Sequence, residues 1–246
     1  MKNINIGNLE LGKIPRVAGI IDGPVTETRL KSFVDRGVDM FEVRADLFNR
    51  PVDKVIDYIK KIRGAVPAPL IGTMRETDFN RADRIRWLVS LAGHVDCVDV
   101  ELGVPGWREV VDGIGAAAVI MVSEHDFNAT PDISGLNDIV KRSVDQGAEI
   151  VKIATMAREA GDVTRLLRFT EDCETPLVTM AMGDIGRISR VAAPLFGSLF
   201  TYGYLRKPVV PGQMSAVSLA RAVKLFPKAP ADASFFNEAP REFDFF

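Results

Sequence analysis

The sequence is poor in the residues that build disulfide frameworks and metal centres. Its two cysteines, Cys97 and Cys173, are too few for a disulfide scaffold or a cysteine-rich metal site. Its two histidines, His94 and His125, stand among scattered carboxylates that give no zinc-binding spacing. We therefore expect no metal, and the low cysteine content is typical of a reducing compartment.

An excess of charge of one sign and long apolar runs are also lacking. The chain carries 31 basic and 33 acidic residues, a formal net charge of −2, and no basic stripe with interleaved aromatics. This composition disfavours nucleic-acid binding. No apolar stretch reaches the roughly 18 residues that span a membrane, and the N-terminus lacks a signal-peptide pattern. We expect a cytoplasmic globular enzyme with no nucleic-acid or membrane partner.

What the sequence does contain is a regular alternation of apolar runs and helical patterns. Eight runs resemble buried strands, at residues 16–21, 39–45, 69–74, 97–102, 117–123, 149–155, 176–182 and 199–205. A helical pattern follows each one, at residues 26–36, 52–63, 81–92, 106–113, 134–146, 158–170, 187–196 and 215–226. Three glycines stand where helix ends favour left-handed backbone, namely Gly37, Gly93 and Gly147.

Eight β/α units in about 250 residues have the size and rhythm of a (β/α)8 TIM barrel. No shift in composition marks a linker, so we predict one α/β domain over residues 1–227. An open doubly wound sheet is the alternative. The phenylalanine-rich segment 228–246 lies beyond the repeat, and we expect it either to dock on the barrel or a partner or to be disordered.

Charged residues are set into these apolar strands at every second position. In Ile150-Val151-Lys152-Ile153-Ala154, Val151 and Ile153 share one face and Lys152 the other. Five further polar residues follow the same rule in the latter half of their strands, namely Glu42, Arg44, Arg75, Ser123 and His125. Since barrel enzymes gather catalytic groups at the carboxyl ends of the strands, we expect these side chains to converge.

A buried lysine suits amine nucleophilicity. Burial and neighbouring cations such as Arg44 or Arg75 disfavour the ammonium and favour the neutral amine. A neutral amine attacks a ketone, and the protonated Schiff base stabilises a carbanion beside the former carbonyl carbon. A histidine is suited to remove that proton and to assist a leaving group. Lys152 and His125 fit as this pair.

Several of these residues also have purely structural interpretations. Lys152 can be structural, and Asp99 and Glu101 can simply pair with barrel arginines. Two methionines, Met180 and Met182, are better suited to filling the barrel than to binding metal. Gly-x-x-Gly at residues 183–186 is weak evidence for phosphate binding.

Seven segments in order resemble the type I 3-dehydroquinate dehydratase family: 42–46, 73–75, 99–102, 123–127, 151–154, 182–190 and 211–213. The resemblance runs from about residue 16 to 226. It implies a (β/α)8 barrel, usually a homodimer, that dehydrates 3-dehydroquinate to 3-dehydroshikimate in the shikimate pathway of aromatic amino acid biosynthesis, without metal or cofactor. Other Schiff-base barrel lyases of the aldolase kind, and a catalytically weak ligand-binding relative, are the alternatives.

The resemblance also assigns roles to individual residues. It implies that Lys152 forms the Schiff base and that His125 acts as the acid and base. It implies substrate contacts for five more residues: Glu42, Arg44, Arg75, Arg190, which would pair with the substrate carboxylate, and Gln213 on a closing loop.

Two positions depart from the family pattern. The glutamate expected four residues after Arg75 is Phe79, so either Asp78 or Glu76 reaches His125 from a rearranged loop, or His125 works without this helper. The serine expected four residues before Gln213 is Val209, so one hydroxyl contact with the substrate is missing.

Overall fold

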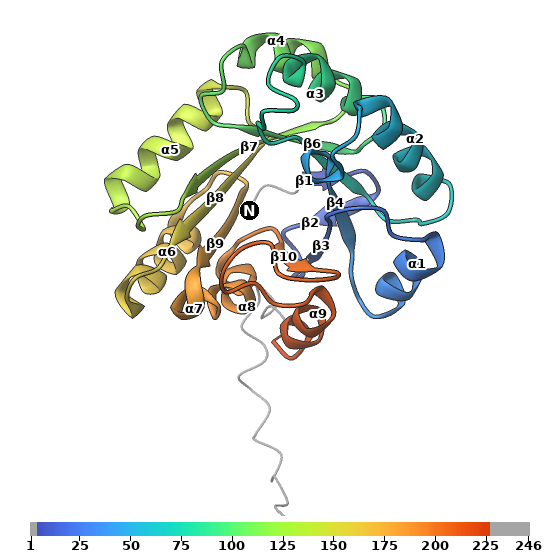
Figure 1. Cartoon of the computed structure of the whole chain (residues 1–246). Coiled ribbons are helices and arrows are strands. Elements are labelled where there is room, and N and C mark those ends of the chain that lie inside the picture. Colours follow the sequence, from blue (N-terminus) through green and yellow to red (C-terminus); the bar gives the residue numbers. More distant parts are fainter. Residues whose placement is uncertain (1–3, 227–246) are drawn as a thin grey trace, which may run out of the picture.

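The computed structural model describes residues 4–226, and the described chain forms a single barrel of parallel strands ringed by helices (Figure 1). A short antiparallel hairpin, β1 (Ile4–Ile6) and β2 (Leu9–Leu11), precedes the barrel. The eight-stranded sheet has the order β10-β3-β4-β5-β6-β7-β8-β9, and every neighbouring pair in it is parallel. The predicted tail, 228–246, lies outside the described residues.

The elements alternate as the sequence predicts. The barrel strands are β3 (Val17–Ile21), β4 (Met40–Arg44), β5 (Leu70–Thr73), β6 (Cys97–Glu101), β7 (Val119–Asp126), β8 (Ile150–Met156), β9 (Leu177–Met182) and β10 (Thr201–Tyr204). The helices are α1 (Glu27–Asp35), η1 (Ala45–Phe48), α2 (Val52–Arg63), α3 (Arg84–Ala92), α4 (Trp107–Ile114), α5 (Ile133–Asp145), α6 (Ala160–Asp172), α7 (Gly183–Gly186), α8 (Ser189–Ala192), η2 (Ala193–Phe196) and α9 (Ala216–Lys224). Each predicted strand overlaps one observed strand, and the barrel is confirmed over the open sheet.

Three local expectations are wrong. The continuous helix predicted over 187–196 is instead α8 followed by η2, where Pro194 cannot supply a backbone donor. Gly93 has φ −70°, so it ends α3 in right-handed backbone, whereas Gly37 and Gly147 do adopt positive φ. The β1–β2 hairpin is absent from the prediction because its strands of three residues are too short for a periodicity signal.

Alternate residues of the strands enter two different cores. Val151 and Ile153 pack outward with α5 and α6 residues such as Leu136 and Leu166. Inward residues of the other strands, among them Met40 and Cys97, form a separate cluster inside the barrel. This separation follows from the two-residue period of a strand, because consecutive side chains point to opposite faces.

The hairpin and a short seam complete the barrel. Ile6 and Leu11 are fully buried in the inner cluster with Met40 and Cys97, so the hairpin fills one end. Between β9 and β10, the Leu199 N–H donates to the Leu177 carbonyl at 2.8 Å, which joins the first and last edges of the sheet. The polar inward residues therefore gather at the other end, where the strands finish.

Candidate active site

The carboxyl ends of the strands surround a cavity that receives all seven candidate residues. Its lining consists of Ile20, Glu42, Arg44, Arg75, His125, Lys152, Ala154, Met180, Met182, Arg190, Tyr202, Val209, Val210 and Gln213. These side chains come from six strands and from the segments that follow β5, β9 and β10. The predicted convergence of polar groups on one mouth is confirmed except for Ser123, which is buried beside the cavity and donates to Asp99. The two methionines line the barrel as expected.

Lys152 lies at the bottom of this cavity and is 5% exposed. Its Nζ donates to Asp99 Oδ2 at 2.8 Å and to Glu42 Oε1 at 3.3 Å. The same nitrogen lies 4.2 Å from the centroid of the Tyr202 ring. The expectation that guanidinium groups are the immediate neighbours is wrong, because two carboxylates and an aromatic face surround the amine.

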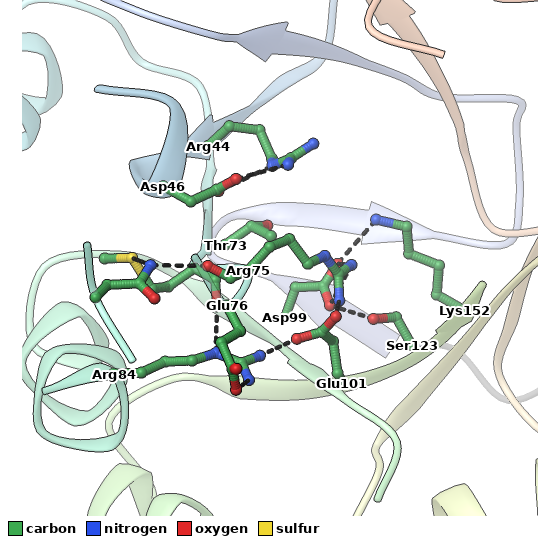
Figure 2. Close-up of polar contacts among 12 residues, drawn as sticks. Arg44, Asp46, Thr73, Arg75, Glu76, Arg84, Asp99, Glu101, Ser123 and Lys152 are labelled. Atoms are coloured by element: carbon green, nitrogen blue, oxygen red, sulfur yellow. Dashed lines mark hydrogen bonds and ion pairs between the residues drawn. The ribbon is translucent and has the colours of Figure 1, made fainter. Parts of the chain in front are cut away.

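Asp99 connects Lys152 to the rest of the polar network, as Figure 2 shows. Its carboxylate accepts hydrogen bonds from Lys152, from Ser123 Oγ at 2.5 Å and from Arg75 Nη2 at 3.2 Å. Burial by itself would raise the pKa of Asp99, but Arg75, Lys152 and Ser123 together hold it well below its ordinary value. Asp99 is thus a carboxylate fixed in its ionised form.

Glu42 accepts hydrogen bonds from fewer groups than Asp99 does. Its Oε1 accepts from Thr73 Oγ1 at 2.9 Å and from Lys152 at 3.3 Å. Both of these hydrogen bonds go to the same oxygen, and the residue, only 2% exposed, lines the cavity. The two carboxylates beside Lys152 are therefore unequal.

The two arginines at the mouth are each held by a carboxylate. Arg44 Nη2 donates to Asp46 at 2.7 Å, and its Nε donates to the same carboxylate at 3.0 Å. Arg75 contacts Asp99 and lies 3.4 Å from Glu101, which also pairs with Arg84 (Figure 2). Asp99 and Glu101 therefore do pair with a barrel arginine, as their structural interpretation expects. That arginine is Arg75, whereas Arg44 pairs with Asp46.

His125 lies within β7, beside the cavity, and is partly buried. No hydrogen bond joins its ring to another described residue, and the ring stacks with Phe127 at a centroid distance of 6.1 Å. Burial, assisted by the positive charges of Arg75 and Lys152, lowers the pKa of His125 far below its ordinary value. The ring is therefore a neutral imidazole, which can accept a proton.

The residue that replaces the family glutamate points away from this site. Phe79 is 54% exposed, and its ring packs on Trp87 at 5.7 Å. Asp78 and Glu76 both pair with Arg81 outside the cavity lining. Neither carboxylate substitutes for the missing glutamate, and within the described chain His125 is positioned without such a partner.

Arg190 is a buried cation that has no anionic partner among residues 4–226. The residue is 1% exposed, and its Nε and Nη2 make no hydrogen bond within that part of the chain. Its Nη1 has weak contacts, at 3.4 Å from the Tyr202 carbonyl and 3.7 Å from the Met180 sulfur. Burial lowers the pKa of Arg190 to about 10, so the group is still charged at neutral pH. A planar guanidinium in this state is suited to bind a carboxylate with two parallel hydrogen bonds.

The segment after β10 covers one side of the cavity. Gln213 Oε1 accepts from the Val209 N–H at 2.8 Å, and the Val209 side chain packs on the inner barrel cluster. Gly212 has φ +74°, and a Cβ on it would lie 2.1 Å from the Gly183 carbonyl oxygen. The close contact of these two glycines joins the segment to the end of β9. Gly183 itself has φ +82°, and a Cβ on Gly186 would lie 2.6 Å from the Ala181 carbonyl carbon, so backbone conformation and packing give both glycines a structural role.

Four residues of this site escaped the sequence analysis: Asp46 as partner of Arg44, Thr73 as partner of Glu42, Arg84 and Tyr202. Tyr202 could have been found, because it occupies an inward position of the last strand in register with Ala18. Arg84 could not, because it reaches the network from the first turn of α3 and donates to the Met74 carbonyl at 2.9 Å. Residues 4–226 contain no group of three potential metal ligands, and none of their helices is long and apolar enough to cross a bilayer.

Comparison with known proteins agrees with this geometry. The family model described as type I 3-dehydroquinase matches residues 10–229. The 3-dehydroquinate dehydratase of Methanocella arvoryzae is 37% identical over 202 residues, which cover 79% of this chain and 90% of the relative. The 3-dehydroquinate dehydratase of Methanothrix thermoacetophila is 34% identical over a match that covers 91% of this chain and 97% of the relative.

The solved structures that resemble this chain are also 3-dehydroquinate dehydratases. The type I 3-dehydroquinate dehydratase of Clostridium difficile with covalent modified comenic acid superposes with a TM-score of 0.79 at 26% identity, covering 91% of this chain and 97% of that one. The enzyme of Geobacillus kaustophilus gives a TM-score of 0.76 at 27% identity, covering 91% and 96%. The chain therefore belongs to the type I 3-dehydroquinase family.

Proposed function

We propose that this protein dehydrates 3-dehydroquinate to 3-dehydroshikimate, a step of the shikimate pathway, through a Schiff base on Lys152. The observation that carries the proposal is a buried lysine in the same cavity as a neutral imidazole and an unpaired guanidinium. These three groups match the three demands of the reaction: attack on a ketone, removal of a proton and binding of a carboxylate. Family membership supports the same substrate.

Arg190 binds the carboxylate of the substrate and so places the ring in the cavity. Its unpaired nitrogens supply the two donors that a carboxylate accepts. Lys152 lies across the same cavity, so the bound ring presents its ketone to the amine. Glu42, Arg44 and Arg75 line the remaining polar wall and contact the ring hydroxyls.

Lys152 then attacks the carbonyl carbon, and loss of water leaves a protonated imine. This cation withdraws electrons from the neighbouring carbon, which lowers the barrier for losing its proton. His125 accepts that proton because its imidazole is neutral, and it then donates a proton to the departing hydroxyl group. Hydrolysis of the imine releases 3-dehydroshikimate and restores Lys152.

The segment containing Gln213 limits the access of water during these steps. Gln213 is 7% exposed and holds the Val209 backbone, and Val209 offers an apolar surface where a hydroxyl is expected. Exclusion of water strengthens the ion pairs inside and protects the intermediate. The segment therefore acts as a cover whose substrate contact is the Gln213 amide.

The direct test combines two measurements on the purified protein. Appearance of the enone absorbance of 3-dehydroshikimate from 3-dehydroquinate measures turnover. Borohydride reduction during the reaction, followed by intact mass and peptide mapping, locates the adduct. We expect turnover together with a stable adduct on Lys152, and absence of both would refute the proposal.

One alternative has a specific observation in its favour. The outward position of Phe79 and the apolar Val209 remove two polar groups of the family pattern, as in a relative that binds ligands with weak catalysis. Binding of 3-dehydroshikimate without turnover would identify that function. A phosphorylated-sugar aldolase is disfavoured, because Arg190 offers one buried carboxylate-sized site and the Gly183 segment is occupied by Gly212.

We further propose that residues 1–227 act as a single catalytic domain with residues 228–246 as an appendage, and that the protein works as a homodimer in the cytoplasm. Family membership supports the first two statements in part, since the family model ends at residue 229. Light scattering of the full chain, beside a chain ending at residue 229, measures the mass and shows whether the appendage contributes to assembly.

A further inference from the structure

The chemistry at Lys152 needs a base before it needs His125. An ammonium has no lone pair, and here the lysine nitrogen donates to two carboxylates. It must lose a proton before it attacks a carbonyl carbon. Because Lys152 is 5% exposed, the immediate acceptors are these two carboxylates, and the structure distinguishes between them.

Asp99 is the poorer acceptor of the two. Arg75 donates to both of its oxygens, Ser123 donates to one, and the side chain is fully shielded from solvent. A proton placed on this carboxylate would break the pairing with a buried arginine. The lowered pKa of Asp99 has the same cause. Asp99 therefore remains an anion and balances the positive charge of the nitrogen throughout the reaction.

Glu42 is the better acceptor. It makes no ion pair with an arginine in the described chain, since Arg44 is held by Asp46 and Arg75 by Asp99 and Glu101. Its Oε1 takes both of its hydrogen bonds within residues 4–226, from Lys152 and Thr73, which leaves Oε2 for a partner in the cavity that Glu42 lines. A proton can therefore be received on this side and delivered to a substrate oxygen.

We propose that Glu42 is the proton carrier for Schiff-base formation, separate from the role of His125 in the elimination; this proposal rests on the proposed function. The Lys152 ammonium gives its proton to Glu42, and the free amine attacks the ketone carbon. The carbonyl π electrons move to oxygen, which takes the proton back from Glu42. Glu42 next removes a proton from the attached nitrogen and delivers it to the hydroxyl, which leaves as water while the nitrogen lone pair forms the iminium. Glu42 ends as a carboxylate beside the cation.

The charged groups that face Glu42 set the pH dependence of this step. They are Lys152 from β8, Asp99 from β6, Arg44 from β4, Arg75 after β5 and the Tyr202 hydroxyl from β10. The arginines are ionised throughout the working pH range, and burial raises the pKa of Tyr202 well above its ordinary value. If the Glu42 carboxylate is removed, hydroxide is the base that takes the proton from Lys152. The rate of Schiff-base formation therefore increases as the pH rises.

The test uses His125→Ala as background, because that variant is expected to accumulate the adduct. We compare it with His125→Ala/Glu42→Gln, in which the amide preserves the shape and the contact with Thr73 but cannot take a proton. Rapid mixing with 3-dehydroquinate and a borohydride quench at successive times gives the rate of adduct formation. We expect the second variant to form the adduct about 10²-fold or more slowly at neutral pH, a typical loss for one acid/base group, with a rate that climbs toward the background rate as the pH rises.

Equal rates in the two variants would overturn the proposal, as would a slow rate with an unchanged pH profile or no adduct at any pH, since Glu42 would then serve binding alone. Failure of His125→Ala itself to form an adduct would assign the proton transfer to His125 and also overturn it. Wild-type protein that gives neither adduct nor turnover would instead refute the proposed function. Circular dichroism and thermal melting of each variant establish that it is folded.

Discussion

Replacement of Arg190 by methionine is predicted to stabilise the free protein against unfolding and to weaken its binding of the substrate. Arg190 is 1% exposed with two nitrogens lacking partners, so its charge is buried without compensation. Burial lowers its pKa from 12.5 to about 10. A difference of about 2.5 in pKa, at roughly 1.4 kcal/mol for each unit, corresponds to a cost of about 3–4 kcal/mol. Because the folded-state pKa is the lower one, this cost persists below pH ~10 and disappears as the pH rises further.

Methionine removes this cost and keeps an unbranched apolar stem in the same place. We expect Arg190→Met to raise the free energy of unfolding by ~1–3 kcal/mol in urea titrations at neutral pH, in line with the effect of replacing buried charges by apolar side chains. We expect the KM for 3-dehydroquinate to rise by about 10- to 100-fold, since a charged hydrogen bond contributes ~1.5–3 kcal/mol.

Arg84 provides the matched control. It is 5% exposed, but it donates to the Met74 carbonyl and pairs with Glu101. Arg84→Met leaves the Met74 carbonyl without its donor and removes one of the two arginine partners of Glu101, so we expect destabilisation by ~1–3 kcal/mol. Two buried arginines thus respond to one substitution with opposite signs. An Arg190→Met protein that is less stable than the wild type, or that has an unchanged KM, would contradict this account of the site.

Three further predictions concern the reaction and the cover of the cavity. Lys152→Ala is expected to abolish borohydride trapping and nearly all turnover, and ordinary activity in this variant would exclude the Schiff base. His125 is expected to remain a neutral imidazole in the free protein through the pH range in which an ordinary histidine takes up its proton, since burial and the nearby cations lower its pKa. The unfolded chain takes up that proton near pH 6.5, so this group makes the folded state lose stability as the pH falls below that value; a His125 NMR signal titrating near pH 6.5, assigned by its loss in His125→Ala, would refute this. Gly212→Ala is expected to displace the Gln213 segment from Gly183, reducing kcat/KM at least tenfold, whereas Gly93→Ala, whose Cβ meets nothing within 4 Å, is expected to retain activity.

Much of the fold could be predicted from the sequence because strand periodicity is local information. Every second residue of a barrel strand faces inward, so Lys152, Glu42 and His125 could be assigned to one face without coordinates. The carboxyl ends of parallel strands form one rim, so these side chains could also be assigned to one mouth. The eight strands were found for the same reason, whereas the three-residue strands of the hairpin were too short to show a period.

The pairing of charges inside the barrel was decided only by the tertiary structure. Sequence reasoning put arginines beside Lys152, yet the fold places Asp99 and Glu42 there and turns Arg44 toward Asp46. The reason is that a strand position fixes which face a side chain shares but not which neighbour it meets across the barrel. That choice depends on the stagger of the strands and on the length of each side chain.

The departures from the family pattern divide in the same way. The sequence by itself determined that the glutamate four residues after Arg75 is missing and that Val209 replaces a serine. Only the structure decided that Phe79 packs outward on Trp87 and that neither Glu76 nor Asp78 takes over its place beside His125. A loop side chain takes its direction from the contacts available around it, and the sequence order of a loop does not specify those contacts.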